Sequence, residues 1–262
     1  MAHLEIKLLG PFQVLINGES ATGFDSDKVR ALLAYLAVEA DRPVRREKLA
    51  GLLWPDFGES AARTNLRQAL ANLRRVLRDQ EAEQPFLLPT HQTIHFNKHS
   101  NHTLDVSSFT ALATGELERS PGIEDLEKAV SLYRGEFLQG FSLPDAATFE
   151  EWALVTRESL QRMAMRVLHR SAGFYEEQAA YEQALHFAYR QLELGPYQED
   201  AHQQVMRLLA QAGQRNEALS HYEAYRQLLQ AELGVTPSNQ RRICTHCSRP
   251  ANCLFLLLFN RG

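Results

Sequence analysis

The sequence predicts a mainly α-helical protein with a small β component in its N-terminal part. Three observations lead to this fold class. Apolar and polar residues alternate over residues 4–16, as they do in half-buried strands. From residue 26 onward, apolar residues recur at helical spacing, and Gly or Pro separates the successive segments. With 44% hydrophobic and 23% charged residues among 262, the chain has enough apolar material for a sizeable core, which excludes wholesale disorder.

The first elements are short strands. Alternation predicts them at residues 4–8 and 12–16, with Gly10-Pro11 between them. Asn17-Gly18 follows as a dipeptide suited to a tight turn with positive φ, and a weaker third strand is expected over Ala21–Phe24.

Three helices come next. They are expected over Ser26–Ala40, Arg45–Leu53 and Ala61–Arg78, and Ser60 is a candidate N-cap for the third. Trp54-Pro55 stops the second helix, because proline disfavours helical geometry in the preceding residue. A hairpin from Phe86–Leu88 to Ile94–Phe96 completes a first domain at residues 1–98.

The rest of the chain has helical character and forms the predicted second domain, residues 103–240. Helices are expected near 107–114, 123–138, 146–176, 179–194, 199–211 and 215–233. The string Ala-Tyr-Arg-Gln-Leu occurs at 188–192 and again at 224–228, and Leu-Gly ends both units. A period of 34 to 39 residues is close to the length of a tetratricopeptide helix–turn–helix repeat, so this domain is predicted to be tetratricopeptide-like.

The third helix carries a basic stripe in a chain whose formal net charge is −4. Its expected inner face is apolar, and the stretch 60–78 contains five arginines and no acid. Arginine, asparagine and glutamine pair with base edges, and arginine also neutralises phosphates. Three helices that follow strands and precede a hairpin are typical of a winged helix-turn-helix, in which the last helix enters the major groove of DNA. The alternative is a solvated amphipathic helix whose arginines are favoured only by helix propensity.

Several long motifs resemble one family. LLGPFQVLING, DKVRALLAYLAVEADRPVRREKLAGLLWPD and ARTNLRQALANLRRVL resemble the OmpR-like winged-helix domain of the Streptomyces antibiotic regulatory protein (SARP) type of transcriptional activator. DLEKAVSLYRGEFLQGF and GPYQEDAHQQVMRLLAQAGQRNEALSHYEAYRQLLQAELGVTPS resemble the bacterial transcriptional activator domain that follows it. The resemblance covers roughly residues 4–239. It implies binding to double-stranded DNA at promoter direct repeats, contact with RNA polymerase, and homodimerisation through the helical domain.

The resemblance also implies site residues. The family's recognition helix matches Ala61–Arg78, and the candidate DNA contacts are Arg63, Thr64, Arg67, Gln68, Arg74 and Arg75. The family's route to polymerase is the loop Trp54–Glu59, in which Pro55, Asp56 and Glu59 are expected to be exposed and Trp54 to be packed. The wing matches Leu87–Phe96, with its tip at Thr90–Gln92, and lacks the family's usual Gly-Tyr pairing.

Other signals predict neither an enzyme nor a cofactor. There is no phosphate-binding glycine loop and no nucleophile elbow. A zinc site at Cys244, His246, Cys247 and Cys253 is disfavoured because three of these four residues are crowded together. The tail 241–262 changes character abruptly and is expected to be poorly ordered.

Composition and segment lengths also bear on location. The first residues lack the basic start and apolar core of a secretory signal, and Cys253–Phe259 is too short to span a bilayer. The three cysteines, all near the C-terminus, cannot form a disulfide framework for the fold. These features predict a cytoplasmic protein with no membrane partner. Response-regulator relatives, which belong to phosphorelays, often carry a receiver domain; none is expected here, because the first strand begins at Leu4.

The functional prediction is a DNA-binding transcriptional regulator that acts as an activator. Its rival is a tetratricopeptide-like interaction scaffold in which the basic helix is incidental. DNA affinity with a steep salt dependence would favour the regulator.

Overall fold

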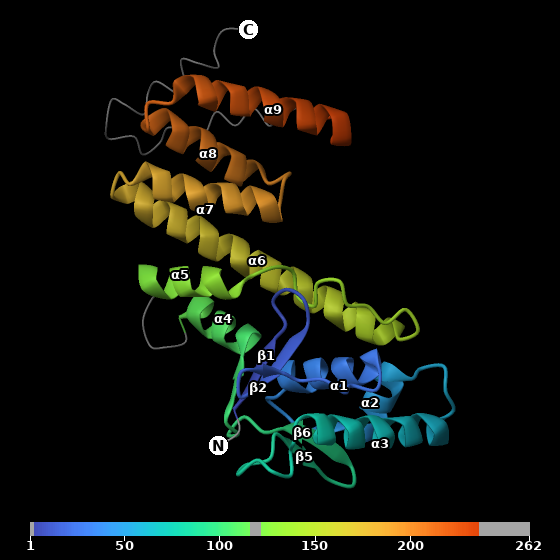
Figure 1. Ribbon diagram of the computed structural model, residues 1–262. Coiled ribbons are helices and arrows are strands. Elements are labelled where there is room, and N and C mark those ends of the chain that lie inside the picture. Colours follow the sequence, from blue (N-terminus) through green and yellow to red (C-terminus); the bar gives the residue numbers. More distant parts are fainter. Residues whose placement is uncertain (1–2, 116–121, 236–262) are drawn as a thin grey trace. The chain divides into compact units, whose positions relative to one another are not determined.

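The computed structural model describes residues 3–115 and 122–235 (Figure 1). Its fold class is the predicted one, mainly helical with a small β component at the N-terminal end. The chain divides into two compact units, Met1–Ala164 and Met165–Gly262. Helix α6 (Ala147–Glu177) contributes its first part to the first unit and its last part to the second.

A four-stranded sheet lies in the first unit, in the order β3-β2-β1-β7. Strands β1 (Leu4–Lys7) and β2 (Gln13–Ile16) pair antiparallel, as their alternation predicts. Strand β7 (His102–Leu104) runs parallel to β1 on its other side. The residues on either side of the predicted boundary at 98–103 therefore share one sheet.

The third strand was expected too far along the chain. Strand β3 is Glu19–Ser20, and Glu19 pairs with Ile16 across the turn Asn17-Gly18. Both turn residues have positive φ, 54° and 84°, which is the conformation a two-residue hairpin needs. The tight turn starts the pairing at once, which is why the strand precedes Ala21–Phe24.

Three helices and a second sheet form the rest of the N-terminal core. The helices are α1 (Asp27–Val38), α2 (Arg46–Leu53) and α3 (Glu59–Val76). The second sheet has the order β4-β6-β5, from β4 (Val44–Arg45), β5 (Leu87–Pro89) and β6 (Thr93–Phe96). Pro89 is the last residue of β5, at an edge of this sheet, where a missing N–H is tolerated.

Helix α3 begins earlier than predicted. Its N-cap is Gly58 rather than Ser60, and no side chain caps it. Ser60 already lies in the first turn, where its carbonyl oxygen accepts a hydrogen bond of 3.0 Å from Thr64 Oγ1. The helix ends at Val76 because Arg78 takes a positive φ of 52° and turns the chain.

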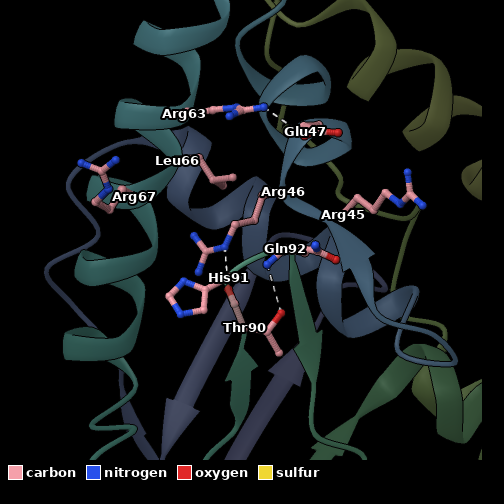
Figure 2. A pocket seen from close by; sticks show the side chains of 9 residues that line it. All are labelled: Arg45, Arg46, Glu47, Arg63, Leu66, Arg67, Thr90, His91 and Gln92. Carbon is pink, nitrogen blue, oxygen red and sulfur yellow. Dashed lines mark hydrogen bonds and ion pairs between the residues drawn. The ribbon is translucent and has the colours of Figure 1, made fainter.

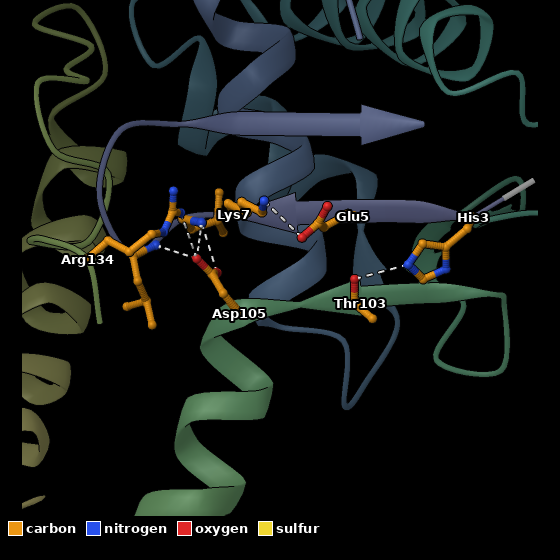
Figure 3. Close-up of polar contacts among 8 residues, drawn as sticks. His3, Glu5, Lys7, Thr103, Asp105 and Arg134 are labelled. Carbon is orange, nitrogen blue, oxygen red and sulfur yellow. Dashed lines mark hydrogen bonds and ion pairs between the residues drawn. The ribbon is translucent and has the colours of Figure 1, made fainter. Parts of the chain in front are cut away.

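A buried carboxylate joins the start of helix α4 (Asp105–Thr114) to the end of β1 (Figure 3). Asp105 accepts hydrogen bonds from Leu8 N, at 2.8 and 2.9 Å, and from Leu9 N, at 2.9 Å. Arg134 Nη2 lies 3.3 Å from the same carboxylate. Burial raises the pKa of the Asp105 carboxyl, whereas the two N–H donors and Arg134 act in the opposite direction.

Helix α5 (Ile123–Leu132) is shorter than the expected 123–138. After it, the chain leaves helical geometry and pairs with the loop between β1 and β2. Leu138 N donates to Leu8 O at 2.8 Å, and Gly10 N donates to Glu136 O at 3.0 Å. Gly10 has a φ of 120°, which favours glycine over other residues.

The second unit contains the end of α6 together with α7 (Tyr181–Leu194), α8 (Glu199–Gln211) and α9 (Arg215–Leu233). Successive helices lie side by side (Figure 1). Ala184 and Ala218, at equivalent places in the two repeat-like units, are both buried, and Gly195 and Gly234 follow the ends of α7 and α9. These features agree with the repeat seen in the sequence.

Polar groups also pack inside this helical unit. Arg207 of α8 makes two hydrogen bonds to the carboxylate of Glu176, at 2.8 and 2.9 Å. His202 Nδ1 lies 3.0 Å from His221 Nε2, and the Tyr225 ring stacks on His202 at 3.8 Å. Burial and, to a smaller extent, the neighbouring His202 together lower the pKa of His221 to about 4, so the folded unit favours the neutral pair.

The tail 241–262 and the disfavoured zinc ligands Cys244, His246, Cys247 and Cys253 lie outside the described residues. In the part of the chain that is described, no group of His, Cys, Asp or Glu side chains could hold a metal ion. No helix over the same residues has both the length and the apolar character needed to cross a membrane.

We expect Asp105→Ala to lower the free energy of unfolding of the first unit by about 2–4 kcal/mol, because buried backbone N–H groups lose their acceptor. Urea denaturation followed by tryptophan fluorescence measures this, since Trp54 and Trp152 both lie in that unit. The matched control is Asp41→Ala, whose exposed carboxylate pairs with Lys98, and which should change stability by no more than about 0.5 kcal/mol. Equal effects of the two substitutions would contradict a central role for Asp105.

Candidate nucleic-acid interface

Helix α3 has one buried and one exposed face, as its sequence predicts. The inner face is buried in the core and comprises Ala62, Leu66, Ala69, Leu70, Leu73 and Val76. Four of the predicted contact residues are exposed on the outer side: Arg63, Thr64, Arg67 and Gln68. Arg75 is also exposed, and Arg74 is partly buried at the flank.

A cavity of about 730 Å³ lies between α3, the start of α2 and the tip of the wing (Figure 2). Four arginines and one glutamate are among its lining residues, which are Arg45, Arg46, Glu47, Arg63, Leu66, Arg67, Thr90, His91 and Gln92. The predicted recognition helix and the predicted wing tip thus face one strongly basic recess. A recess of this charge suits an anion such as a backbone phosphate.

Arg46, the first residue of α2, connects this helix to the tip of the wing through hydrogen bonds. Its side-chain Nε donates to Thr90 O at 2.9 Å, and its backbone N donates to Gln92 O at 2.9 Å. Burial lowers the pKa of the Arg46 guanidinium, and the positive charge of Arg67 lowers it further. An anion bound between Arg46 and Arg67 would relieve their mutual repulsion.

Several predicted contact residues already have partners in the fold. Arg63 Nη2 lies 2.9 Å from Glu47 and 2.6 Å from Glu59, and Arg75 Nη2 lies 3.3 Å from Asp25. By contrast, Arg67 has no carboxylate within ion-pair distance among the described residues. The stretch 60–78 contains no acid, but acidic residues from other segments pair with Arg63 and Arg75. The positive charge available to a ligand is therefore smaller than the sequence of this stretch indicates.

Arg74 has a structural partner. Its Nε lies 2.8 Å from Oδ2 of Asp79, whose side chain is 0% exposed, and Oδ1 of Asp79 accepts a bond from Leu87 N at 3.1 Å. Arg74 thus stabilises the connection between α3 and the wing. Asn72, on the opposite flank of α3, is also buried and donates to Gly23 O at 3.0 Å.

The loop between α2 and α3 has the predicted exposure pattern. Trp54 is buried, whereas Pro55, Asp56 and Glu59 are exposed. The sequence interpretation missed Phe57, whose large apolar side chain is 50% exposed in the same loop. It also missed Arg45 and Arg46, although this pair at the start of a short helix is a basic signal that could have been noted.

Comparison with known proteins identifies the family. The model of the bacterial transcriptional activator domain matches residues 104–245, which is more than half of the chain. The chain belongs to this family. EmbR from Mycobacterium tuberculosis, a transcriptional regulatory protein, is 26% identical over 245 residues, covering 90% of this chain and 60% of EmbR. The regulatory protein AfsR from Streptomyces coelicolor is 30% identical over 245 residues, covering 89% of this chain and 23% of AfsR.

A solved structure shares the fold. The structure of Mycobacterium tuberculosis EmbR in complex with a low affinity phosphopeptide matches with a TM-score of 0.68 at 23% sequence identity, over 91% of this chain and 63% of that chain. These similarities confirm the predicted kinship with SARP-type activators that contain this domain. They also support the prediction of a non-enzymatic protein, because the family and the named relatives are regulators. The chain spans less than two thirds of the length of these relatives.

Arg74 has a buried ion-pair partner and Arg67 has none among the described residues, so the two side chains should differ in their effect on stability. Arg74→Ala leaves the buried Asp79 carboxylate without its cation and should lower the free energy of unfolding of the first unit by about 2–4 kcal/mol. Arg67→Ala, on the exposed side of the same helix, should change it by no more than about 0.5 kcal/mol. Urea denaturation of the two variants in parallel is the measurement. An Arg74→Ala protein as stable as the parent would remove the structural role of that ion pair.

Proposed function

We propose that the chain is a sequence-specific DNA-binding transcriptional regulator of the activator type, with α3 in the major groove. The observation that carries this proposal is the basic recess between α3 and the wing tip, in which Arg46 and Arg67 lie close together. The exposed planar groups of Arg67 and Gln68 would read base edges. Arg45, Arg46 and the wing tip would contact phosphates beside that groove.

The relatives supply the biological setting of the proposal. EmbR and AfsR are both named as regulatory proteins, and EmbR as a transcriptional one. By the same kinship, promoter direct repeats would be the DNA target, with residues 1–98 as the DNA-binding domain and residues 103–240 as the activator domain. Homodimerisation through the helical domain and a cytoplasmic location belong to the same proposal.

DNA binding is tested with Arg67→Ala combined with Arg75→Ala. Because both side chains are exposed, folding should be unaffected, whereas affinity should fall by about 1–3 kcal/mol for each lost base contact. Where the lost contact is to a phosphate, the salt slope should fall by about 1 instead. Duplexes selected from a random-sequence pool by the parent protein serve as the probe in gel-shift titrations at several salt concentrations.

The matched control for this test is Arg162→Ala, which removes an exposed arginine from α6. It should leave both affinity and salt slope unchanged. If the double variant binds as the parent does, α3 is not the DNA-binding helix. If the parent selects no duplex and binds none, the interaction-scaffold alternative takes its place.

The loop Trp54–Glu59 is the proposed contact with RNA polymerase. Asp56→Ala and Glu59→Ala change exposed carboxylates, so each should reduce activated transcription. Operator affinity should stay the same in Asp56→Ala, whereas Glu59→Ala also removes the ion pair to Arg63, so its activation is compared at saturating protein. In vitro transcription from a promoter that carries the selected site, measured beside gel shifts, separates the two effects. A parallel loss of binding and activation would assign the loop to DNA contact or to folding instead.

A further inference from the structure

The ammonium group of Lys28 lies where three segments of the first unit meet. Lys28 belongs to the first turn of α1, and its side chain is only 14% exposed. Its Nζ lies 2.7 Å from Oδ2 of Asp145, which precedes α6. The same atom lies 5.5 Å from the ring centroid of Trp54 and 5.7 Å from that of Phe57.

This arrangement suits a fixed ammonium group. Aromatic faces attract a cation within about 6 Å, and the attraction grows as water is excluded. Both rings belong to the loop Trp54–Glu59. The ammonium group of Lys28 therefore contacts the buried aromatic residue of this loop, Trp54, and its exposed one, Phe57. The hydrogen bond from Lys28 holds the pKa of Asp145 below its ordinary value, so the carboxylate is charged at neutral pH.

The backbone around Asp145 is fixed by its surroundings, and the Asp145 side chain itself is 59% exposed. The next residue, Ala146, is 0% exposed, and its N donates to Leu143 O at 2.9 Å. The start of α6 is held to α1 through Trp152, whose Nε1 donates to Glu39 Oε1 at 3.0 Å and whose ring lies 4.8 Å from that of Tyr35. The carboxylate that faces Lys28 therefore comes from a firmly packed part of the unit.

The exposed half of the loop has the character of a protein contact rather than a DNA contact. Phe57 presents an apolar ring that is 50% exposed, between Asp56 and Glu59. The loop Trp54–Glu59 contains no basic residue, so it would repel a phosphate backbone. An exposed ring flanked by carboxylates matches a basic protein surface with an apolar recess.

We infer that Phe57 is the apolar anchor through which the loop binds a basic surface of RNA polymerase, and that Lys28 and Asp145 position it. The inference rests on the proposed function of the loop. Asp145 lies within the segment 104–245 that matches the activator-domain family. Through its ion pair with Lys28, this segment therefore helps to position the loop Trp54–Glu59 of the winged helix.

The positioning role has a spectroscopic test that needs neither DNA nor polymerase. The chain contains two tryptophans, so Trp152→Phe leaves Trp54 as the only one. This substitution keeps an aromatic ring beside Tyr35 but loses the hydrogen bond to Glu39, so quenching is compared only among variants in this background. In this background, Asp145→Asn should release the loop and increase quenching of Trp54 by acrylamide. Lys28→Arg keeps a cation beside both rings and should quench like the background, whereas Lys28→Met should behave like Asp145→Asn.

The control for the quenching measurement is Glu158→Gln, which removes an exposed carboxylate of α6 that does not face Lys28. It should leave the Trp54 signal unchanged. Identical quenching in Asp145→Asn, Lys28→Met and the background would overturn the positioning role. The same is true if Glu158→Gln raises quenching as much as Asp145→Asn does.

The anchor role is tested by binding to purified bacterial RNA polymerase holoenzyme and by transcription. Phe57→Ala should weaken polymerase binding and activated transcription by about fivefold or more, the loss typical of an interface anchor, with DNA affinity unchanged. Phe57→Tyr should retain most of both, and Asp145→Asn should show part of the loss. Full activity of Phe57→Ala would overturn the anchor role even if Asp56→Ala is defective.

Failure of the proposed function looks different. A parent protein that binds neither DNA nor polymerase would refute that function, and the anchor role with it. The Trp54 measurements would still decide whether Lys28 and Asp145 hold the loop. A parent that binds both, together with loss of DNA affinity in Phe57→Ala, would assign Phe57 to the DNA interface and overturn the inference.

Discussion

The four-stranded sheet of the first unit depends on one buried carboxylate, that of Asp105. Asp105 starts α4, ends the parallel pairing of β7 with β1, and accepts the N–H groups of two consecutive residues, Leu8 and Leu9. Without that acceptor, both N–H groups would be buried without a hydrogen-bond partner at the point where β1 ends. The segment that follows α5 also pairs with this part of the chain, through Leu8 O and Gly10. The sheet, α4 and the later segment are therefore joined at one place.

A second principle is the division of labour along α3. Arg74 and Asn72, on the two flanks of the helix, serve the fold through Asp79 and Gly23 respectively, whereas Arg67 and Gln68 are exposed on the outer face. The wing is held to the start of α2 by Arg46, so hydrogen bonds within the protein fix two sides of the recess relative to each other. Preorganised cationic groups of this kind lower the cost of ordering side chains when an anionic partner binds.

The sequence predicted the helices well because their signals are local. Apolar spacing and Gly or Pro punctuation placed α7, α8 and α9 within about two residues of their observed bounds. The contacts that the sequence could not reveal join distant segments, such as Arg63 with Glu47, Arg74 with Asp79, and Lys28 with Asp145. The early start of α3 at Glu59 was missed because Ser60 has the side chain of a typical N-cap but lies two residues after the observed N-cap, Gly58.

The parallel pairing of β1 with β7 has a consequence for biosynthesis. The ribosome makes Leu4–Lys7 nearly a hundred residues before its partner His102–Leu104. At ordinary rates of synthesis, β1 waits roughly 5–20 s with one hydrogen-bonding edge open. An open edge of this kind invites pairing with another chain, so the nascent protein is most exposed to misassembly, and to chaperone capture, during that interval. The same long separation predicts slow closure of this sheet when the purified chain refolds.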